Sequence, residues 1–547
     1  MKRKILVIGL DGATPDILFP LIDQGIMPNL ERIVRQGASG PLISTIPPAT
    51  GPAWLSLATG LKPESTGVFD FWIRRGESYR LRSLNSDALR GRAVWDFLSR
   101  AGKDSGIFCY PMLRPPYEIR GFMTTGLGAW PVEEFTWPRE LKQEIFTAAG
   151  GPFDLLLPYH EERYDDPDLF LNHLEAMLEK QARATEYLLF NKPWDLFWVV
   201  FSQTDWLQHL FWRHIDPAHP LYEGPRSQDI RCKFHAFWSK IDGVLGKLID
   251  HAGPNANICI LSDHGFGTND KVFKLNAWLE RKGYLVRKDT SQSLRMKIKQ
   301  GAMTTVRGAA RTLRVGRLLP GIHQKGRQWM DNIRLSVLDR IDLEKSTAFD
   351  PGHTIPFGGI YIHDREAPTR EAKLKIAASI ARELKLWGEE NQVKIKSWHP
   401  YGPDNPESAA GPDLLVAVEY WRCVLLKDRF DGDLLEARPH SPRHTGSHRM
   451  NGILMADGPD IRNTKLESAR IIDITPTLLY LFDLPLPSNL DGKIIEDMLT
   501  PEYLNRHPVT GLKKAPASQP AVSRPGSGDP GSDEETIRKM LKDLGYM

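Results

Sequence analysis

Short, almost continuously apolar runs recur along the chain, and three of them end in a cluster of polar residues. They span residues 4–10, 195–202 and 256–261, and they are rich in Val, Ile, Leu and Phe. A continuous apolar run of this length predicts a strand that is buried on both faces, as in a parallel sheet. The polar residues behind each run therefore lie at the carboxyl ends of strands.

Longer segments with helical spacing of apolar positions alternate with these runs. Pro28 fits the first turn of a helix, and Gly37 fits a helix end. The expected helices are 15–36, Ala93–Ala101, 168–190 and Lys233–His251, and the further expected strands are Ser105–Tyr110, 358–362 and 413–418. This alternation predicts an α/β fold with a mostly parallel sheet flanked by helices on both faces.

Aspartates and histidines gather directly after the three apolar runs. Asp11 follows the first, Asp205 with His209 follows the second, and Asp263 with His264 follows the third. In open α/β sheets, functional residues lie just past the carboxyl ends of strands. Converging carboxylates repel one another unless a cation lies between them, and imidazole ligands favour a transition metal over Mg²⁺ or Ca²⁺. The sequence therefore predicts a metal site.

Composition and charge exclude several classes of function for this chain. The 547 residues are 41% hydrophobic and 25% charged, which is typical of a globular enzyme. A formal net charge of +3 is too small to indicate a nucleic-acid partner. The four cysteines are widely spaced and form no CxxC motif, which excludes a cysteine zinc ribbon and favours a reducing compartment. We therefore expect a cytoplasmic protein that acts on a small molecule.

The N-terminus resembles a signal peptide only briefly. The basic residues 2–4 precede an apolar run, but Asp11 and Gly12 end that run after six residues. This is too short for a secretory signal, and no run of about 18 apolar residues occurs anywhere in the chain. We expect neither export nor a membrane span.

Several stretches interrupt the alternation of strands and helices. Residues 290–330 carry nine Lys or Arg and no acidic residue. We interpret them as solvated basic helices; the alternative is a surface that attracts an anionic substrate or a phospholipid. The expected division is 1–110, 171–285 and 344–506 as three parts of the core, 111–170 as an inserted cap, 286–343 as a basic helical insertion, 507–531 as a flexible linker, and 532–547 as a C-terminal helix.

A second informative segment is the turn at residues 47–60. Thr50 stands where a helix N-cap belongs, with Pro52 in the first turn and an apolar helix behind it. The same position suits a nucleophile, because backbone N–H groups and the helix dipole favour an alkoxide and a bound anion at a helix N-terminus. A neighbouring metal ion lowers the pKa of such a hydroxyl further.

Together these segments resemble the alkaline phosphatase superfamily, and within it the type I phosphodiesterase/nucleotide pyrophosphatase branch. The resemblance covers roughly residues 1–275 and 345–500. The motifs that carry it, in family order, are Leu10-Asp11-Gly12, Ala49-Thr50-Gly51-Pro52 with Thr59-Gly60-Leu61-Lys62-Pro63-Glu64-Ser65-Thr66-Gly67, Thr204-Asp205 with His209, Ser262-Asp263-His264-Gly265, and Gly446-Ser447-His448.

The resemblance implies two divalent metal ions and a threonine nucleophile. One ion would be held by Asp205, His209 and His448, and the other by Asp11, Thr50, Asp263 and His264. Nitrogen and carboxylate ligands favour Zn, with Mn as an alternative. His440, His444 and His448 lie close together, and we choose His448 because Gly446-Ser447 precedes it as in the family, with His444 second.

The expected function is hydrolysis of phosphoesters, with a phosphodiester or nucleotide pyrophosphate as the favoured substrate. Ala53, three residues after Thr50, offers no side chain to hold a phosphoryl oxygen, so the choice between diester and monoester stays open. A sulfatase is excluded, since Thr50 cannot form its aldehyde and Trp54 stands where its Arg would be. The alternatives are a phosphomonoesterase, a phosphotransferase or phosphomutase, and an inactive metal-binding interaction module.

Overall fold

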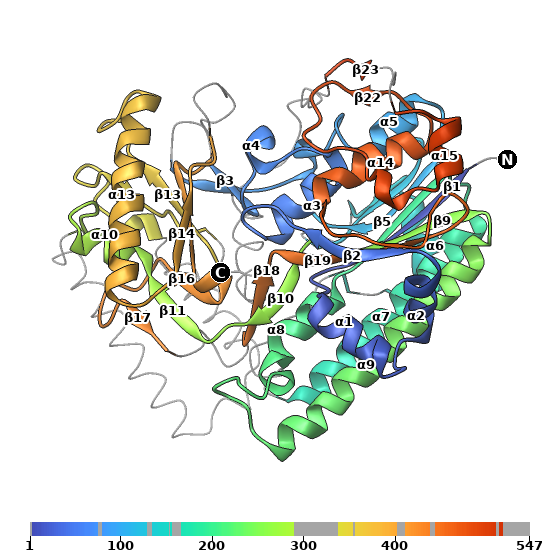
Figure 1. The fold of residues 1–547 in the computed structure, drawn as a ribbon, viewed down its shortest axis with the longest axis horizontal. Helices are drawn as coiled ribbons and strands as arrows, with labels where there is room; N and C mark the ends of the chain where they lie inside the picture. The colour runs from blue at the N-terminus through green and yellow to red at the C-terminus, as the bar shows by residue number, and fades with distance from the viewer. Residues whose placement is uncertain are drawn as a thin grey trace.

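The fold is built on β1 (Lys4–Leu10), which lies at the centre of a ten-stranded sheet (Figure 1). β1 pairs in parallel with β8 (Leu196–Phe201) on one side and with β9 (Ala256–Leu261) on the other. The sheet runs in the order β20 (Thr464–Lys465), β2 (Ala38–Ile43), β19 (Asn451–Asp457), β9, β1, β8, β5 (Ser105–Tyr110), β6 (Gly121–Thr125) and β7 (Thr136–Trp137), with β21 (Ala469–Arg470) also paired to β2. Only β19 and β7 run antiparallel to their neighbours in the sheet.

The computed structural model describes residues 3–74, 79–127, 134–152, 154–155, 166–288, 337–353, 356–401, 411–437, 444–509 and 514–517. The basic segment 290–330, the C-terminal helix expected at 532–547 and most of the linker expected at 507–531 lie outside these residues. No described helix is long and apolar enough to span a membrane. The domain boundaries stay a prediction.

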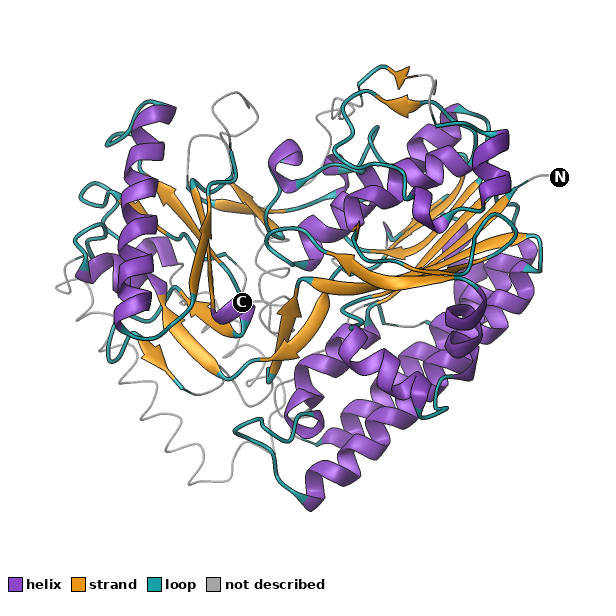
Figure 2. Ribbon diagram, in the orientation of Figure 1, coloured by secondary structure: helices purple, strands orange, loops and turns teal. Residues whose placement is uncertain are grey.

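Helices cover both faces of the central sheet (Figure 2). One layer contains α1 (Pro15–Asp23), α2 (Pro28–Gln36), α7 (Pro167–Asn191), α8 (Gln203–Ile215) and α9 (Pro225–Ala252), and the other contains α3 (Thr50–Thr59), α5 (Val94–Arg100), α14 (Ile474–Leu481) and α15 (Pro501–Arg506). α6 (Leu141–Ala149) packs on α7. The mostly parallel sheet between two helical layers is therefore confirmed.

Two helix predictions need correction. The helical stretch expected at 15–36 consists of two helices, because Gly25 adopts a positive φ of 72° and ends the first one; Pro28, expected in a first turn, begins the second. The helix expected at Lys233–His251 begins earlier, at Pro225, a residue type that is favoured in a first turn.

A second lobe with its own core lies beside the large one (Figure 1). Its antiparallel sheet has the order β12 (Ala348–Phe349), β13 (Gly358–Ile362), β15 (Leu414–Val418) and β14 (Ile395–Trp398). Further elements are α10 (Leu275–Arg281), α13 (Arg370–Glu390), β11 (Lys271–Lys274), β16 (Cys423–Leu426) and β17 (Leu435–Glu436). The strands expected at 358–362 and 413–418 thus form here rather than in the central sheet.

Candidate metal centre and nucleophile

The candidate ligands converge at one edge of the central sheet. Asp11 follows β1, Asp205 lies in the first turn of α8 behind β8, and Asp263 and His264 follow β9. Because these three strands are parallel neighbours, their carboxyl ends meet at the same edge. His448 arrives from β18 (Gly446–Arg449), whose pairing with β10 (Gly265–Thr268) places it opposite Phe266.

Backbone contacts hold the three strand ends together. Thr204 Oγ1 donates to the carbonyl of Asp11 at 2.7 Å, and the N–H of Gly12 donates to Asp263 Oδ1 at 3.1 Å. Gly12 has a positive φ of 67°, and a Cβ there would lie 3.0 Å from Asp205 Oδ1. Glycine is therefore required at this position for both backbone conformation and space.

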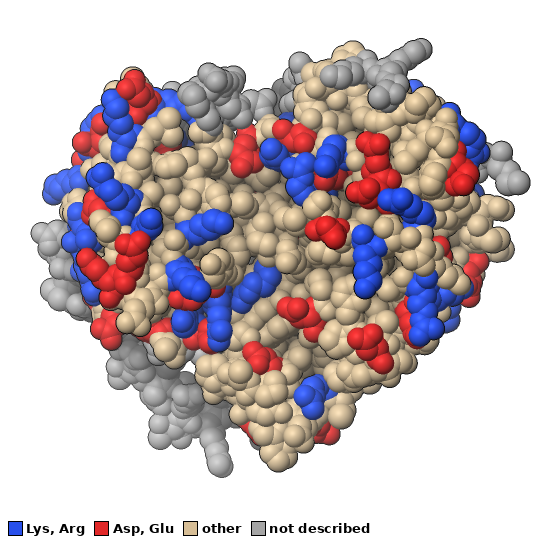
Figure 3. All heavy atoms as spheres, in the orientation of Figure 1, with Lys and Arg blue, Asp and Glu red and all other residues tan. Residues whose placement is uncertain are grey.

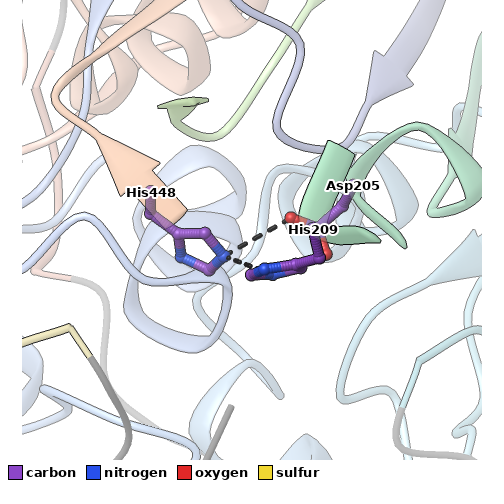
Figure 4. A group of neighbouring side chains, drawn as sticks. All are labelled: Asp205, His209 and His448. Atoms are coloured by element: carbon purple, nitrogen blue, oxygen red, sulfur yellow. Dashed lines mark hydrogen bonds and ion pairs between the residues drawn. The ribbon is translucent and has the colours of Figure 1, made fainter. Parts of the chain in front are cut away.

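Asp205, His209 and His448 form the first group, and their side chains point toward one another (Figure 4). His448 Nε2 lies 3.2 Å from His209 Nε2 and 3.4 Å from Asp205 Oδ1, and His209 Nε2 lies 3.4 Å from Asp205 Oδ2. A tetrahedral zinc with bonds of about 2.0–2.1 Å separates its ligands by about 3.3–3.4 Å. The spacing of the three residues fits that requirement.

The three histidines present the same nitrogen to the site. The Nδ1 atoms of His209, His264 and His448 lie 3.0–3.1 Å from the backbone carbonyls of Gly446, Gly265 and Pro48, respectively. A carbonyl oxygen only accepts, so each Nδ1 carries the hydrogen and the lone pair of each imidazole lies on Nε2. A backbone acceptor on the second ring nitrogen is typical of metal-binding histidines.

A second group surrounds His264 Nε2. This atom lies 3.1 Å from Thr50 Oγ1, 3.2 Å from Asp263 Oδ2 and 3.7 Å from Asp11 Oδ1. Asp11 Oδ1 and Asp263 Oδ2 are buried and accept no hydrogen bond from any described residue. Ligand atoms of Asp11, Asp205 and His264 also lie within 4.8 Å of one another, so Asp205 stands between the two groups.

Burial sets the electrostatics of the site, since none of the seven candidate residues is more than 4% exposed. Burial and the charges of Asp263 and Asp205 hold the pKa of Asp11 well above its usual range, and burial raises the pKa of Asp263 to about 8. Burial also lowers the pKa of His209 to about 4 and that of His264 well below its usual value. For Asp205, burial opposes ionisation, but His209 and His448 hold its pKa below the usual range. Mutual repulsion and burial therefore make Asp11 and Asp263 hold their protons in the metal-free site, and a bound cation would relieve that repulsion and favour the ionised carboxylates.

Thr50 is the first residue of α3 and not its N-cap, so the sequence-based cap assignment is wrong. The N-cap is Ala49, whose extended backbone carries no side-chain capping bond. The Thr50 hydroxyl makes no capping bond, and it contacts His264 Nε2 in the candidate site instead. Trp54, four residues later on the same face of the helix, was not predicted as a site residue, and its indole N–H donates to Asp11 Oδ2 at 3.4 Å.

The other histidines of this region lie elsewhere. His214 and His219 are 2% and 3% exposed; His214 Nδ1 lies 2.9 Å from Ser227 Oγ, and its Nε2 accepts from Arg213 at 2.9 Å. His444, the second choice as a ligand, contacts His209 edge to face but belongs to neither group of described ligands. His440 lies outside the described residues.

Comparison with known proteins gives one family and a set of similar structures. The family described as type I phosphodiesterase/nucleotide pyrophosphatase matches residues 5–373. No curated protein sequence matches the chain significantly. Murine ectonucleotide pyrophosphatase/phosphodiesterase 5, in an inactive form with AMP, is similar at 16% identity and a TM-score of 0.49, covering 91% of this chain and 100% of its own. Phosphonoacetate hydrolase from Sinorhizobium meliloti, with phosphonoformate, is similar at 16% identity and a TM-score of 0.48, covering 88% and 95%.

Proposed function

The chain belongs to the type I phosphodiesterase/nucleotide pyrophosphatase family, and on that premise we propose that it hydrolyses phosphodiesters or nucleotide pyrophosphates through a phospho-threonine intermediate at Thr50. A single observation carries the proposal. The Thr50 hydroxyl lies 3.1 Å from His264 Nε2, inside a buried cluster in which Asp11 Oδ1 and Asp263 Oδ2 accept no hydrogen bond from a described residue.

The donor set supports two divalent cations, with Zn favoured and Mn as the alternative. Asp205, His209 and His448 would hold one, and Asp11, Thr50, Asp263 and His264 the other. When bound, such cations supply positive charge for the phosphoryl oxygens and lower the pKa of a hydroxyl or water.

The chain's own residues then perform two displacements. Thr50 Oγ1, having lost its proton to solvent, forms a bond to phosphorus while the bond from phosphorus to the leaving oxygen breaks, and that oxygen takes up a proton. Water next forms a bond to phosphorus and gives up a proton, the bond from phosphorus to Thr50 Oγ1 breaks, and Thr50 Oγ1 takes up a proton, which restores the hydroxyl. The indole N–H of Trp54 donates to Asp11 Oδ2 and holds this carboxylate in place during both steps.

Two further properties belong to the proposal. A cytoplasmic location is supported by the four cysteines, all of which lie in described segments and none of which forms a disulfide. Contact of residues 290–330 with an anionic surface rests on their sequence alone. On the face shown in Figure 3, Lys and Arg are interspersed with Asp and Glu over both lobes, so the described part of that face has no extended basic patch.

A hydrolysis panel tests the proposed activity. Protein loaded with Zn or Mn would be assayed with bis-p-nitrophenyl phosphate, p-nitrophenyl phosphate and a nucleotide p-nitrophenyl ester. We expect the diesters to be turned over faster than the monoester. Faster turnover of the monoester would assign a phosphatase instead, and no turnover of any ester by the metal-loaded protein would favour the inactive interaction module.

A further inference from the structure

A pocket of about 600 Å³ lies between the two lobes, beside the candidate metal centre. Its wall on the large lobe comes from α1, β2 and the start of β19, and its wall on the small lobe comes from β14 and the turn that follows β15 (Figure 1). Phe266 also lines it, and the Phe266 ring centroid lies 4.8 Å from that of His209. None of the seven candidate site residues is among its lining residues. The lining includes Asp16, Lys396, Trp398, Tyr420, Trp421 and Arg449, and we call this space the inter-lobe pocket.

The small-lobe wall of the inter-lobe pocket contains a turn with an unusual backbone. Glu419, Tyr420 and Trp421 all have positive φ angles, of 52°, 52° and 71°. The left-handed region costs free energy at every residue other than glycine, and three such residues in succession are rare. Backbone of this kind persists only where the surrounding structure enforces it, and it is concentrated at active sites and ligand-binding sites.

This turn places two aromatic side chains at the pocket. Trp421 is 4% exposed, and its indole stacks on that of Trp398 with ring centroids 5.4 Å apart and planes 7° apart. Tyr420, by contrast, is 64% exposed. Arg449 Nη1 holds the turn in place, because it donates to the carbonyl of Trp421 and to that of His448, both at 2.8 Å. The strained turn is therefore tied to β18 and presents an aromatic surface to the pocket.

Positive charge exceeds negative charge among the lining residues. Lys396 and Arg449 line the pocket, against the single carboxylate of Asp16. The Lys396 ammonium lies 5.4 Å from the ring centroid of Trp398, and it forms no ion pair with any described residue. A planar ring can stack on aromatic side chains of this kind, and a negative group attached to that ring is attracted to the neighbouring ammonium. The volume is also typical of a small-molecule site.

We propose that the inter-lobe pocket binds a planar aromatic anion, whose ring packs against Trp398 and Tyr420 and whose negative group contacts the ammonium of Lys396. The alternative is a simple apolar seam between two lobes. A seam of that kind explains neither the left-handed turn nor the exposure of Tyr420, because lobes that only pack together bury their aromatic residues. The proposed site is separate from Thr50 and does not depend on the proposed hydrolysis.

Binding of 1-naphthalenesulfonate to the metal-loaded protein, measured by calorimetry, tests the proposal with an aromatic anion that contains no phosphorus. Saturating inorganic phosphate, compared with chloride at matched ionic strength, keeps the sulfonate away from the candidate metal centre. We expect saturable binding of one probe per chain under both conditions, tighter than the binding of neutral 1-naphthalenemethanol. Absence of saturable binding, or its loss when phosphate is added, would overturn the proposal.

Substitutions in the pocket test each part of the contact. Tyr420→Ala and Trp398→Leu should each weaken sulfonate binding by roughly 10- to 100-fold, the loss typical of a stacking contact. Lys396→Gln should weaken binding of the sulfonate but not of the neutral alcohol, and the loss should shrink at high salt. Trp387→Leu and Lys385→Gln change residues of α13 in the same lobe that do not line the pocket, and they are the matched controls. Native affinity in the folded pocket variants, or equal losses in the controls, would contradict the proposed site.

Tyr420→Gly distinguishes a turn that is kept for binding from one that is kept for stability. Glycine adopts a positive φ without steric cost, so this variant should unfold at the same or a higher denaturant concentration than the native protein. It should nevertheless lose sulfonate binding as Tyr420→Ala does. Chemical denaturation and calorimetry measure the two quantities. A Tyr420→Gly protein that is less stable than the native one would show that the tyrosine serves the folded structure, which would overturn the assignment of this turn to a ligand.

Discussion

Two sets of buried aspartates in this molecule have very different surroundings. Asp242, on α9, is 2% exposed, and both of its carboxylate oxygens accept hydrogen bonds of 2.9–3.0 Å from Asn29 and Leu30 at the N-terminus of α2. Asp11 and Asp263 are equally buried, yet each keeps one oxygen that accepts no hydrogen bond from a described residue. Burial alone therefore does not distinguish the candidate ligands from Asp242; their oxygens without a hydrogen bond do.

The same contrast applies to the histidines. His214 uses both ring nitrogens, one with Ser227 and one with Arg213, and it is a structural residue. His209 and His448 use Nδ1 on a carbonyl and direct Nε2 toward Asp205. The predictions below test this distinction between candidate metal ligands and fully hydrogen-bonded buried residues, beginning with the largest expected effect.

Thr50 lies beside the carboxylates of Asp11 and Asp263, and its hydroxyl should be indispensable for hydrolysis. Thr50→Ala should lower kcat by orders of magnitude, because the covalent route is lost. Stability should change by about 1 kcal/mol or less, since the hydroxyl makes no capping bond and only one buried hydrogen bond is removed. Thermal unfolding and steady-state assays measure both, and near-normal activity would remove Thr50 from the mechanism.

Metal removal should affect the candidate ligands Asp11 and Asp263 but not the hydrogen-bonded Asp242. Chelation should abolish activity and lower the Tm of the native protein, and added Zn should restore both. Asp263→Asn should lose metal and activity, yet its metal-free form should be more stable than metal-free native protein, because repulsion among three carboxylates is relieved. Elemental analysis with thermal unfolding checks this; active protein without transition metal would contradict the two-metal centre.

Asp242→Asn is the matched control for Asp263→Asn. It places an amide where N–H donors of α2 need acceptors, so we expect a loss of about 1–3 kcal/mol in the free energy of unfolding. Metal content and kcat should stay at the native level. Chemical denaturation measures the free energy of unfolding. A drop in metal content would contradict the distinction, because it would show that a buried aspartate outside the candidate site is also needed for metal binding.

His214 should make stability depend on pH. Burial lowers its pKa to about 4 in the folded protein, whereas the unfolded chain titrates near 6.5. Stability is therefore complete above pH 6.5 and is lost as pH falls from 6.5 toward 4, because only the unfolded chain takes up the proton. His214→Gln should flatten this part of the stability curve in metal-free protein, and a curve parallel to the native one would assign the slope to other groups.

The smallest effect concerns the basic segment, which lies outside the described residues. Replacing Arg307, Arg311 and Arg314 by neutral residues should leave kinetics unchanged at every ionic strength if this segment is solvated surface. A loss in kcat/KM that shrinks at high salt would show steering of an anionic substrate. Lost binding to anionic vesicles with normal catalysis would instead identify a membrane-surface role.

The strands that carry the candidate ligands were predictable because each is a continuous apolar run with an aspartate within four residues of its end. Asp11 follows β1 directly, and Asp263 follows β9 after Ser262, so local sequence is sufficient to place them. Trp54 had only its spacing of four from Thr50 as a signal. The contact between Asp70 and His353 joins residues 283 positions apart, and no periodic pattern encodes such pairing. The separate small lobe was missed for the same reason, since antiparallel partners such as β13 and β15 are chosen by packing.

The late position of β19 determines when the molecule can assemble. β19 is inserted between β2 and β9, two strands formed from residues made long before it. Until residues 451–457 leave the ribosome, β2 has no partner in the sheet core and β9 presents an open, apolar edge, which is the kind of edge that recruits other chains. His448 emerges in the same stretch. Closure of the sheet and completion of the first candidate ligand group are therefore nearly simultaneous, so a growing chain does not present the whole candidate site before its central sheet is closed.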